Sequence, residues 1–310
     1  MDRRWFLRAA GGTGVVGAAG AAGWALHEPP PLPDEAKRDE RNDASGLPTG
    51  GAGAFGIHRV IYSVPVAEPF VALTFDDGPD PQFTPRVLEI LAGYDIKATF
   101  NVMGYNAMHH DDILKGLVAA GHEVGNHTWT HLDLSKVDAT ETAYEIRRGR
   151  EVIEDLTKLK IRFFRPPRGE MSGAAVRLVA EEGNDILMWS ITGSVPGREA
   201  PAEVNSFVLD HLEPGAIIDF HDGIGRGTFA PNAPWARDLV ERRTAEVEGL
   251  PKLIETAMAK GYRFMRVSDL LDHEVPGKTP SKTSDESEDA DEGTPDITNP
   301  PDATDPKGNS

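Results

Sequence analysis

Hydrophobic and polar positions alternate with two different periods along the middle of the chain. Short apolar runs such as VALTF at residues 71–75 have the period of two that is typical of strands. Longer runs such as TPRVLEILAGY at residues 84–94 have the spacing of amphipathic helices. We expect strands near residues 71–75, 97–102, 122–127, 161–166, 185–191, 216–221 and 263–267. We expect helices near residues 84–94, 111–121, 139–156, 173–183, 201–212 and 239–260.

Seven strands that are each separated by a helix predict parallel pairing through right-handed crossovers. The sequence therefore predicts an α/β fold, which is either a (β/α) barrel or an open doubly wound sheet. In both architectures functional side chains gather at the carboxyl ends of the strands. Four polar clusters follow predicted strands and should converge there: DDG, NHTWTH, RPPRG and HDG.

The two ends of the 310-residue chain differ from its middle in composition. Arg3-Arg4 followed by a weakly apolar Ala/Gly run predicts an export signal at residues 1–27 that the twin-arginine machinery would recognise. The alternatives are an ordinary hydrophobic anchor or a chance pattern. Two outcomes stay open for this segment, namely cleavage near Ala19-Gly20-Ala21 or retention as a membrane tether.

Composition also separates a linker and a tail from the folded part. Residues 28–56 are rich in Pro, Gly and charge and are predicted as a linker. Residues 276–310 contain one large aliphatic residue, Ile297, and no aromatic residue, so we expect an acidic disordered tail. The catalytic domain is therefore predicted to span residues 57–275.

The charge of the chain narrows the class of partner. The formal net charge is -18, of which the tail supplies -6 through nine acidic and three basic residues. The remaining -12 argues against nucleic acid or an anionic membrane surface as the main partner. The chain has no cysteine, which agrees with an exported protein that lacks disulfides. We infer no stable protein partner and expect an extracellular or cell-envelope location.

The first polar cluster places two carboxylates where a strand ends. In the alternating run, Asp76 points to one face of the strand and Asp77 begins the loop beyond it. Aspartate is also common in turns as a backbone cap, so DDG alone does not indicate chemistry. NHTWTH places His127 and His131 four residues apart, the spacing that brings two imidazoles to one side of a helical turn. With one carboxylate they would form a hydrolytic metal site, whereas the alternative is ordinary hydrogen bonding.

The four clusters together resemble a known family. TFDDGP, GHEVGNHTWTH, FRPPRG and IIDFHDG occur in this order and resemble the motifs of the polysaccharide deacetylase (NodB-homology) family, carbohydrate esterase family 4. The resemblance covers about residues 68–272. It implies a distorted (β/α) barrel of about seven parallel strands and a divalent metal, usually Zn²⁺. It also implies removal of an acetyl group from an N-acetylated amino sugar.

The resemblance assigns roles by motif position. It implies three metal ligands, Asp77, His127 and His131. It implies that Asp76 is the general base and that Arg165 holds it ionised, because a nearby opposite charge favours the carboxylate. His221 would be the general acid that protonates the leaving amine.

Arg168 and Trp129 are assigned to substrate binding. Arg168 stands where the family more often has Tyr. Its guanidinium would favour glycans with carboxylate or phosphate groups, and the alternative is a surface arginine paired with one of the many carboxylates.

The sequence departs from the family pattern at two further places, which concern the residues that would hold the acid His221 in position. Val195 and Pro196 stand where the family has an Asp and an aromatic residue, and Asp219 stands where it generally has Leu. Because Asp219 and His221 are two apart in a strand, we expect both to face the barrel interior. We hypothesise that Asp219 is catalytic, orienting the imidazole and raising its pKa. The alternatives are that Asp219 binds substrate directly or pairs with a buried arginine.

The favoured function is a metal-dependent hydrolase that removes N-acetyl groups from an envelope or extracellular glycan. Hydrolysis of a non-sugar amide and a glycan-binding relative without turnover are the alternatives. Peptidoglycan, chitin-like oligomers and acetylated exopolysaccharide all stay open as substrates.

Overall fold

The computed structural model describes residues 59–194 and 200–275. The predicted signal, linker and tail lie outside these residues, as do Val195 and Pro196. No helix in the described ranges has the length and apolar character needed to cross a membrane.

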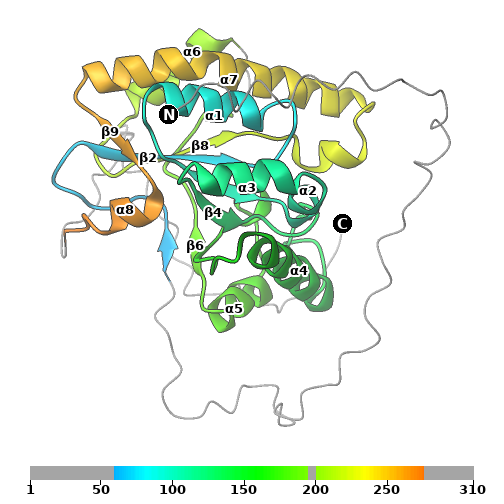
Figure 1. Cartoon of the computed structure of the whole chain (residues 1–310). Coiled ribbons are helices and arrows are strands. Elements are labelled where there is room, and N and C mark those ends of the chain that lie inside the picture. Colours follow the sequence, from blue (N-terminus) through cyan, green and yellow to red (C-terminus); the bar gives the residue numbers. More distant parts are fainter. Residues whose placement is uncertain (1–58, 195–199, 276–310) are drawn as a thin grey trace, which may run out of the picture. The chain divides into compact units, whose positions relative to one another are not determined.

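Strands and helices alternate along the chain as expected (Figure 1). The strands are β1 (Val60–Ile61), β2 (Phe70–Asp76), β3 (Thr99–Val102), β4 (Glu123–Asn126), β5 (Phe163–Phe164), β6 (Asp185–Leu187), β7 (Ile191–Thr192), β8 (Ile217–His221) and β9 (Arg263–Met265). The α-helices are α1 (Thr84–Gly93), α2 (Gly104–His109), α3 (Asp111–Ala119), α4 (Ala139–Thr157), α5 (Gly173–Glu181), α6 (Pro201–Asp210), α7 (Pro234–Ala259) and α8 (Val267–Leu271). Two 3₁₀ helices follow strands that border the site, η2 (Pro167–Gly169) and η3 (Gly225–Phe229).

All the strand ladders are parallel, and the strands form one curled sheet. The strand order is β1-β6-β5-β4-β3-β2-β8-β7, and β9 pairs with the beginning of β2. β6 and β7 are consecutive in the chain yet lie near opposite ends of this order, so the sheet must curl to bring them together. The predicted distorted (β/α) barrel is therefore confirmed.

The described residues contain nine strands where about seven were predicted. One addition is β1, and the other arises because the run 185–191 forms two short strands. Arg165 explains this break, since its guanidinium donates to the carbonyl oxygens of Leu187 (3.1 Å) and Met188 (2.9 Å). Carbonyls that face a buried guanidinium are satisfied without a ladder partner.

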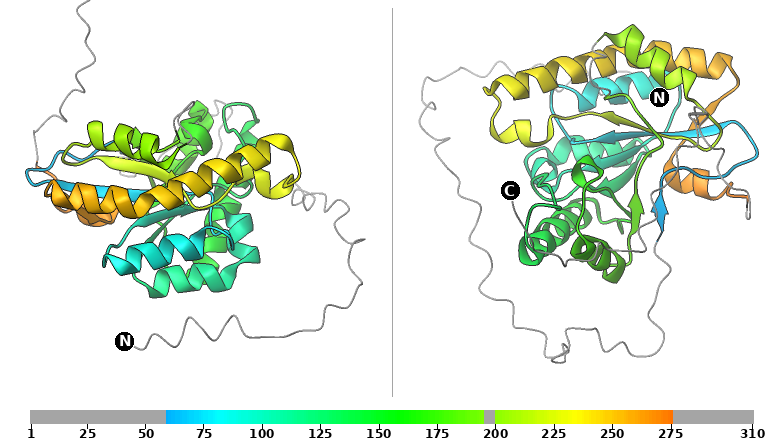
Figure 2. Two further views of the ribbon diagram at one scale, coloured as in Figure 1. Left: turned by 90° about the horizontal axis from the view of Figure 1, so that it is seen from above. Right: turned by 180° about the vertical axis from the view of Figure 1, so that it is seen from behind.

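Strand β2 is buried along its whole length and joins the two halves of the core. Its Val71, Leu73 and Phe75 side chains pack in one hydrophobic cluster with residues of α1 and α7, while Ala72 packs in another. This alternation agrees with the period of two in the sequence. Figure 2 shows α6 and α7 side by side against the outside of the sheet.

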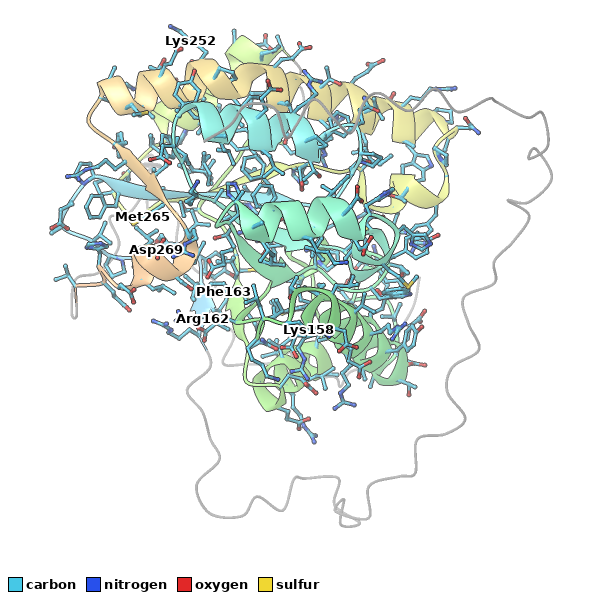
Figure 3. The ribbon with its side chains drawn as sticks, in the orientation of Figure 1. Lys158, Arg162, Phe163, Lys252, Met265 and Asp269 are labelled. Atoms are coloured by element: carbon cyan, nitrogen blue, oxygen red, sulfur yellow. The ribbon has the colours of Figure 1, made fainter. Side chains whose placement is uncertain are left out.

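Helix α8 covers the amino-terminal ends of β3 and β4. The Val267 N–H donates to Thr99 Oγ1 (3.0 Å), and the Ser268 N–H donates to Glu123 Oε2 (3.2 Å). Arg162, which Figure 3 labels near Asp269, donates to Ser268 Oγ at 3.3 Å. This end of the sheet is closed, which leaves the opposite, carboxyl end for a site.

Candidate active site

The four polar clusters meet in one cavity of about 530 Å³ at the carboxyl ends of the strands. Seven of the nine predicted site residues line it, namely Asp76, Asp77, His127, His131, Arg168, Asp219 and His221. Of the other two, Arg165 is fully buried and contacts Asp76, and Trp129 lies elsewhere.

The loop that carries Asp77 is held in an unusual conformation. Asp77 has a φ of 76°, in the left-handed region, and its carbonyl accepts a hydrogen bond from Asn106 Nδ2 (2.8 Å). The Gly78 N–H donates to Asp222 Oδ1 (3.2 Å), and a Cβ at Gly78 would lie 2.3 Å from Asp222 Oδ2. Only glycine fits this close approach, which explains the Gly after the paired carboxylates.

Asp77, His127 and His131 bring their ligand atoms within 4.8 Å of one another. Asp77 Oδ1 lies 3.2 Å from His131 Nε2 and 3.6 Å from His127 Nε2. His127 Nδ1 lies 2.8 Å from the carbonyl oxygen of Arg165. Because a carbonyl can only accept, Nδ1 carries the proton and Nε2 presents a lone pair toward Asp77.

These three residues fit a divalent cation. Asp77 Oδ1, which faces Nε2 of both histidines, is buried and has no hydrogen-bond partner among the described residues. Burial lowers the pKa of His131 to about 4, which keeps the imidazole neutral, as a ligand must be. Burial would raise the pKa of Asp77, but His131, His221 and Arg243 together hold it well below its usual range. One carboxylate with two imidazoles is a donor set that suits zinc.

The two histidines do not reach this position through a helical turn, so that prediction is wrong. Thr128 and His131 have φ values of 69° and 60°, and the segment is a loop. Thr128 Oγ1 accepts a hydrogen bond from the His131 N–H (2.9 Å), which fixes the reversal of the chain. The two rings still meet, with centroids 5.0 Å apart.

Asp76 lies beside this cluster with one oxygen occupied. Its Oδ1 accepts from Arg165 Nη1 (2.8 Å) and from Asn101 Nδ2 (2.8 Å) on the neighbouring strand β3. Burial favours the neutral acid, but Arg165 and His127 outweigh it and lower the pKa of Asp76. Asp76 is therefore ionised, and its Oδ2 lies 3.7 Å from His127 Nε2.

Asp219 faces the interior but does not hydrogen-bond to His221, so the orienting part of its predicted role is wrong, whereas its charge does act to raise the pKa of His221. It accepts from Arg165 Nη1 (3.0 Å) and from Thr192 Oγ1 (3.3 Å). Pairing with a buried arginine was one of the alternatives, and the structure has this arrangement. Burial and the Asp76 charge raise the pKa of Asp219 to about 7.

The partner of His221 is Glu246 of α7. The sequence analysis did not predict a role for Glu246. Glu246 Oε2 accepts from the His221 N–H (2.8 Å) and lies 3.2 Å from His221 Nδ1. Burial and Arg243 act to lower the pKa of His221, but Glu246 and Asp219 outweigh them and raise it to about 9. His221 is thus positively charged near neutral pH in the absence of a cation.

Arg243 links the His221–Glu246 pair to the candidate metal ligand Asp77. Its Nη1 donates to Glu246 Oε1 (2.9 Å), and its Nη2 lies 3.5 Å from Asp77 Oδ2. A signal for both residues exists in the sequence. Along α7, a stripe of residues at apolar spacing is buried and contains two charged residues: Arg243, Glu246, Leu250, Leu253 and Ala257.

Trp129 does not line the cavity, and its predicted role in substrate binding is wrong. It is only 4% exposed, with the Arg148 guanidinium 5.2 Å from its ring centroid and the Tyr105 ring 5.7 Å away. The tryptophans that line the cavity are Trp189 and Trp235.

A curled parallel sheet with an Asp-His-His cluster beside a second, ionised carboxylate defines a hydrolase of the distorted (β/α) barrel class. The polysaccharide deacetylase family model matches residues 63–186. A peptidoglycan-N-acetylglucosamine deacetylase of Bacillus cereus is 32% identical over 217 residues, which cover 68% of this chain and 92% of that protein. The chain belongs to the polysaccharide deacetylase family, carbohydrate esterase family 4, and is a hydrolase of that family.

Other relatives are named for related activities. A chitooligosaccharide deacetylase of Sinorhizobium fredii is 34% identical over 63% of this chain and 88% of that protein. The solved peptidoglycan N-acetylglucosamine deacetylase Bc1960 superposes with a TM-score of 0.60 at 30% identity, over 69% of this chain and 94% of that chain. A CE4 family pseudoenzyme from Bacillus anthracis superposes with a TM-score of 0.59 at 26% identity, over 69% of both chains.

Proposed function

We propose that this protein is a metal-dependent N-deacetylase of an amino-sugar-containing glycan in the cell envelope or extracellular space. One observation carries the proposal. Asp77 Oδ1, which has no hydrogen-bond partner among the described residues, faces the Nε2 atoms of His127 and His131 beside Asp76, which Arg165 keeps ionised. The relatives that act on peptidoglycan and on chitooligosaccharides support a glycan substrate.

Asp77, His127 and His131 would hold the cation, and Zn²⁺ suits this set best. When bound, the cation supplies Lewis acidity, which polarises the acetyl carbonyl and acidifies water.

Asp76 and His221 divide the proton transfers. Asp76 Oδ1 already accepts two hydrogen bonds, so Oδ2 is the atom that takes a proton from the attacking water. The water oxygen bonds to the acetyl carbon, and the C–N bond then breaks. His221, on the adjacent strand in register with Asp76, gives its proton to the leaving nitrogen. With Nδ1 held by Glu246, Nε2 is the donor, and acetate and a free amine are released.

Release of acetate tests this function directly. The purified protein would be incubated with and without Zn²⁺ on peptidoglycan, chitin oligomers, acetylated exopolysaccharide and a small cyclic amide. We expect zinc-dependent acetate release from at least one glycan. Ring opening of the cyclic amide releases no acetate, so its loss is measured separately, and activity on it alone would favour the alternative hydrolase. Glycan binding without turnover, under any metal condition, would place the protein with the pseudoenzyme.

We also propose that residues 1–27 direct export through the twin-arginine machinery. The Arg3-Arg4 pair ahead of a weakly apolar run supports this. Replacing both arginines with lysine should retain the protein inside the cell, as measured by fractionation. Unchanged export of that variant would reject the proposal.

A further inference from the structure

The mouth of the cavity is rich in arginine although the chain is strongly acidic. Arg168, Arg226 and Arg242, here called the arginine rim, all line the cavity. Among the described residues, no carboxylate lies within ion-pair distance of these three guanidinium groups. Arginines elsewhere do pair, as Arg177 does with Glu181 at 2.7 Å. Cations without a partner around a cavity create a site for an anion.

The rim charge is not needed to balance the carboxylates deeper in the cavity. Asp76 is paired with Arg165, and Asp77 lies near Arg243 and the two histidines. Apart from Asp76, Asp77 and Asp219, Asp238 is the only acidic residue among the described residues that line the cavity. Three guanidinium groups and one carboxylate make the described part of the mouth of the cavity positive.

Helix α7 contributes one face to this mouth. Trp235, Asp238, Leu239 and Arg242 line the cavity and have the i, i+3, i+4, i+7 spacing of a single helix face. Trp235 is 47% exposed, and its indole offers a flat apolar surface at the cavity edge. Arg226 comes from η3, which precedes the helix and packs against it.

We propose that Arg226, Arg242 and Trp235 form an anion subsite for a glycan that carries a carboxylate or phosphate group. The planar guanidinium groups would bind the anion with paired hydrogen bonds, and the indole would pack against the sugar ring. This subsite differs from the hypothesis for Arg168 in the sequence analysis. Arg168 lies on η2 after β5, whereas the residues of the subsite lie on η3 and α7. The inference rests on the proposed deacetylation of a glycan and specifies which glycans the site prefers.

The test compares substrates that differ only in charge. Glycan strands of alternating N-acetylglucosamine and N-acetylmuramic acid carry free lactyl carboxyl groups. The same strands with these groups converted to methyl amides are neutral. A chemically phosphorylated chitin oligomer and its unmodified parent form the second pair. Acetate release gives kcat/KM for the wild type, for the double variant Arg226→Gln/Arg242→Gln and for the control Arg237→Gln, which is exposed on α7 and does not line the cavity.

We expect the wild type to prefer the charged member of at least one pair by about tenfold, the order expected for two partly exposed ion pairs. The double variant should lose most of this preference while it keeps its rate on the neutral member, and Arg237→Gln should keep both. The pair that shows the effect identifies carboxylate or phosphate as the ligand. Equal kcat/KM on charged and neutral strands, or an unchanged preference in the double variant, would overturn the proposal.

Failure of the deacetylase function would be recognised separately. If the wild type releases acetate from none of the four substrates, calorimetric titration with the carboxylated and amidated strands still measures the subsite. Tighter binding of the carboxylated strand that depends on Arg226 and Arg242 would support it. Equal binding would overturn it.

Discussion

Neutralising Glu246 provides a direct test of how the acid His221 is prepared for proton transfer. Glu246→Gln keeps the size of the side chain and removes its charge. Glu246 Oε2 accepts from the His221 N–H and lies 3.2 Å from Nδ1, while Arg243 contributes positive charge nearby. The substitution leaves that positive charge in place and takes away the main group that favours the imidazolium. The pKa of His221 must therefore fall.

The structure gives the size of this effect. The pKa of His221 rises from 6.5 to about 9, which corresponds to ~3 kcal/mol in favour of the charged ring. Opposite charges 3.2 Å apart attract by about 5 kcal/mol at an effective dielectric constant near 20. The attraction of Glu246 is larger than the whole elevation, because it also offsets burial and Arg243. We expect the pKa of His221 in Glu246→Gln to fall by about two units or more.

The alkaline limb of kcat/KM against pH reports the pKa of the acid in the free enzyme. It should move toward lower pH in Glu246→Gln, and the rate at pH 8 should fall. A cation in the site lowers the absolute pKa in both enzymes, so the comparison is made at equal metal content. Glu248→Gln is the matched control, since Glu248 is exposed on the same helix and should leave the limb unchanged. Glu246→Asp, which keeps the charge, should shift the limb less.

An unmoved limb in folded, metal-loaded Glu246→Gln would refute this account of His221. Asp219 gives a graded comparison, because it also raises the pKa of His221, though less than Glu246 does. Asp219→Asn should shift the limb in the same direction by a smaller amount. A larger shift from Asp219→Asn than from Glu246→Gln would restore the role first predicted for Asp219.

Three other predictions follow from the site and the core. Asp77→Ala should remove metal and activity together, whereas Asp76→Asn should keep the metal and lose about two to four orders of magnitude in rate. Elemental analysis measures the bound metal, and acetate release measures the rate. Trp129→Ala should lower the free energy of unfolding by about 3–5 kcal/mol, whereas Trp235→Ala should barely change it in urea titrations. Burial lowers the pKa of His122 to about 4, so the unfolded chain binds that proton more readily. Stability should therefore fall as pH drops from about 6.5 to about 4, by about 3 kcal/mol, and His122→Gln should reduce this dependence.

The sequence predicted the parts of the fold that depend on local pattern. The alternation in residues 71–75 and the polar clusters after strands were enough to predict a parallel sheet with a site at its carboxyl edge. The pairing of Arg165 with Asp76 followed from motif position and is present at 2.8 Å. These features have a short range in sequence or a fixed place at a strand end, so a pattern can reveal them.

Features that depend on tertiary packing were missed or misread. His127 and His131 meet through left-handed residues of a loop, and four-residue spacing cannot distinguish that loop from a helix. Glu246 looked like one of many charged residues on a surface helix. Its spacing along α7 indicates a buried face, but its pairing with His221 depends on how α7 packs against η3 and β8, which no local pattern states. Trp129 was assigned to substrate binding, yet the loop after β4 turns its side chain into the core, where it is 4% exposed.

The candidate site is assembled from two separate stretches of the chain. The family model ends at residue 186. The candidate metal ligands Asp77, His127 and His131, the proposed base Asp76 and Arg165 all precede that residue. His221, Arg243, Glu246 and two members of the arginine rim follow it. The two stretches meet in one sheet, because β2 pairs in register with β8 from Ala72 to Asp76. Substitutions in the second stretch can therefore change the working pH of the acid while the cation ligands stay as they are.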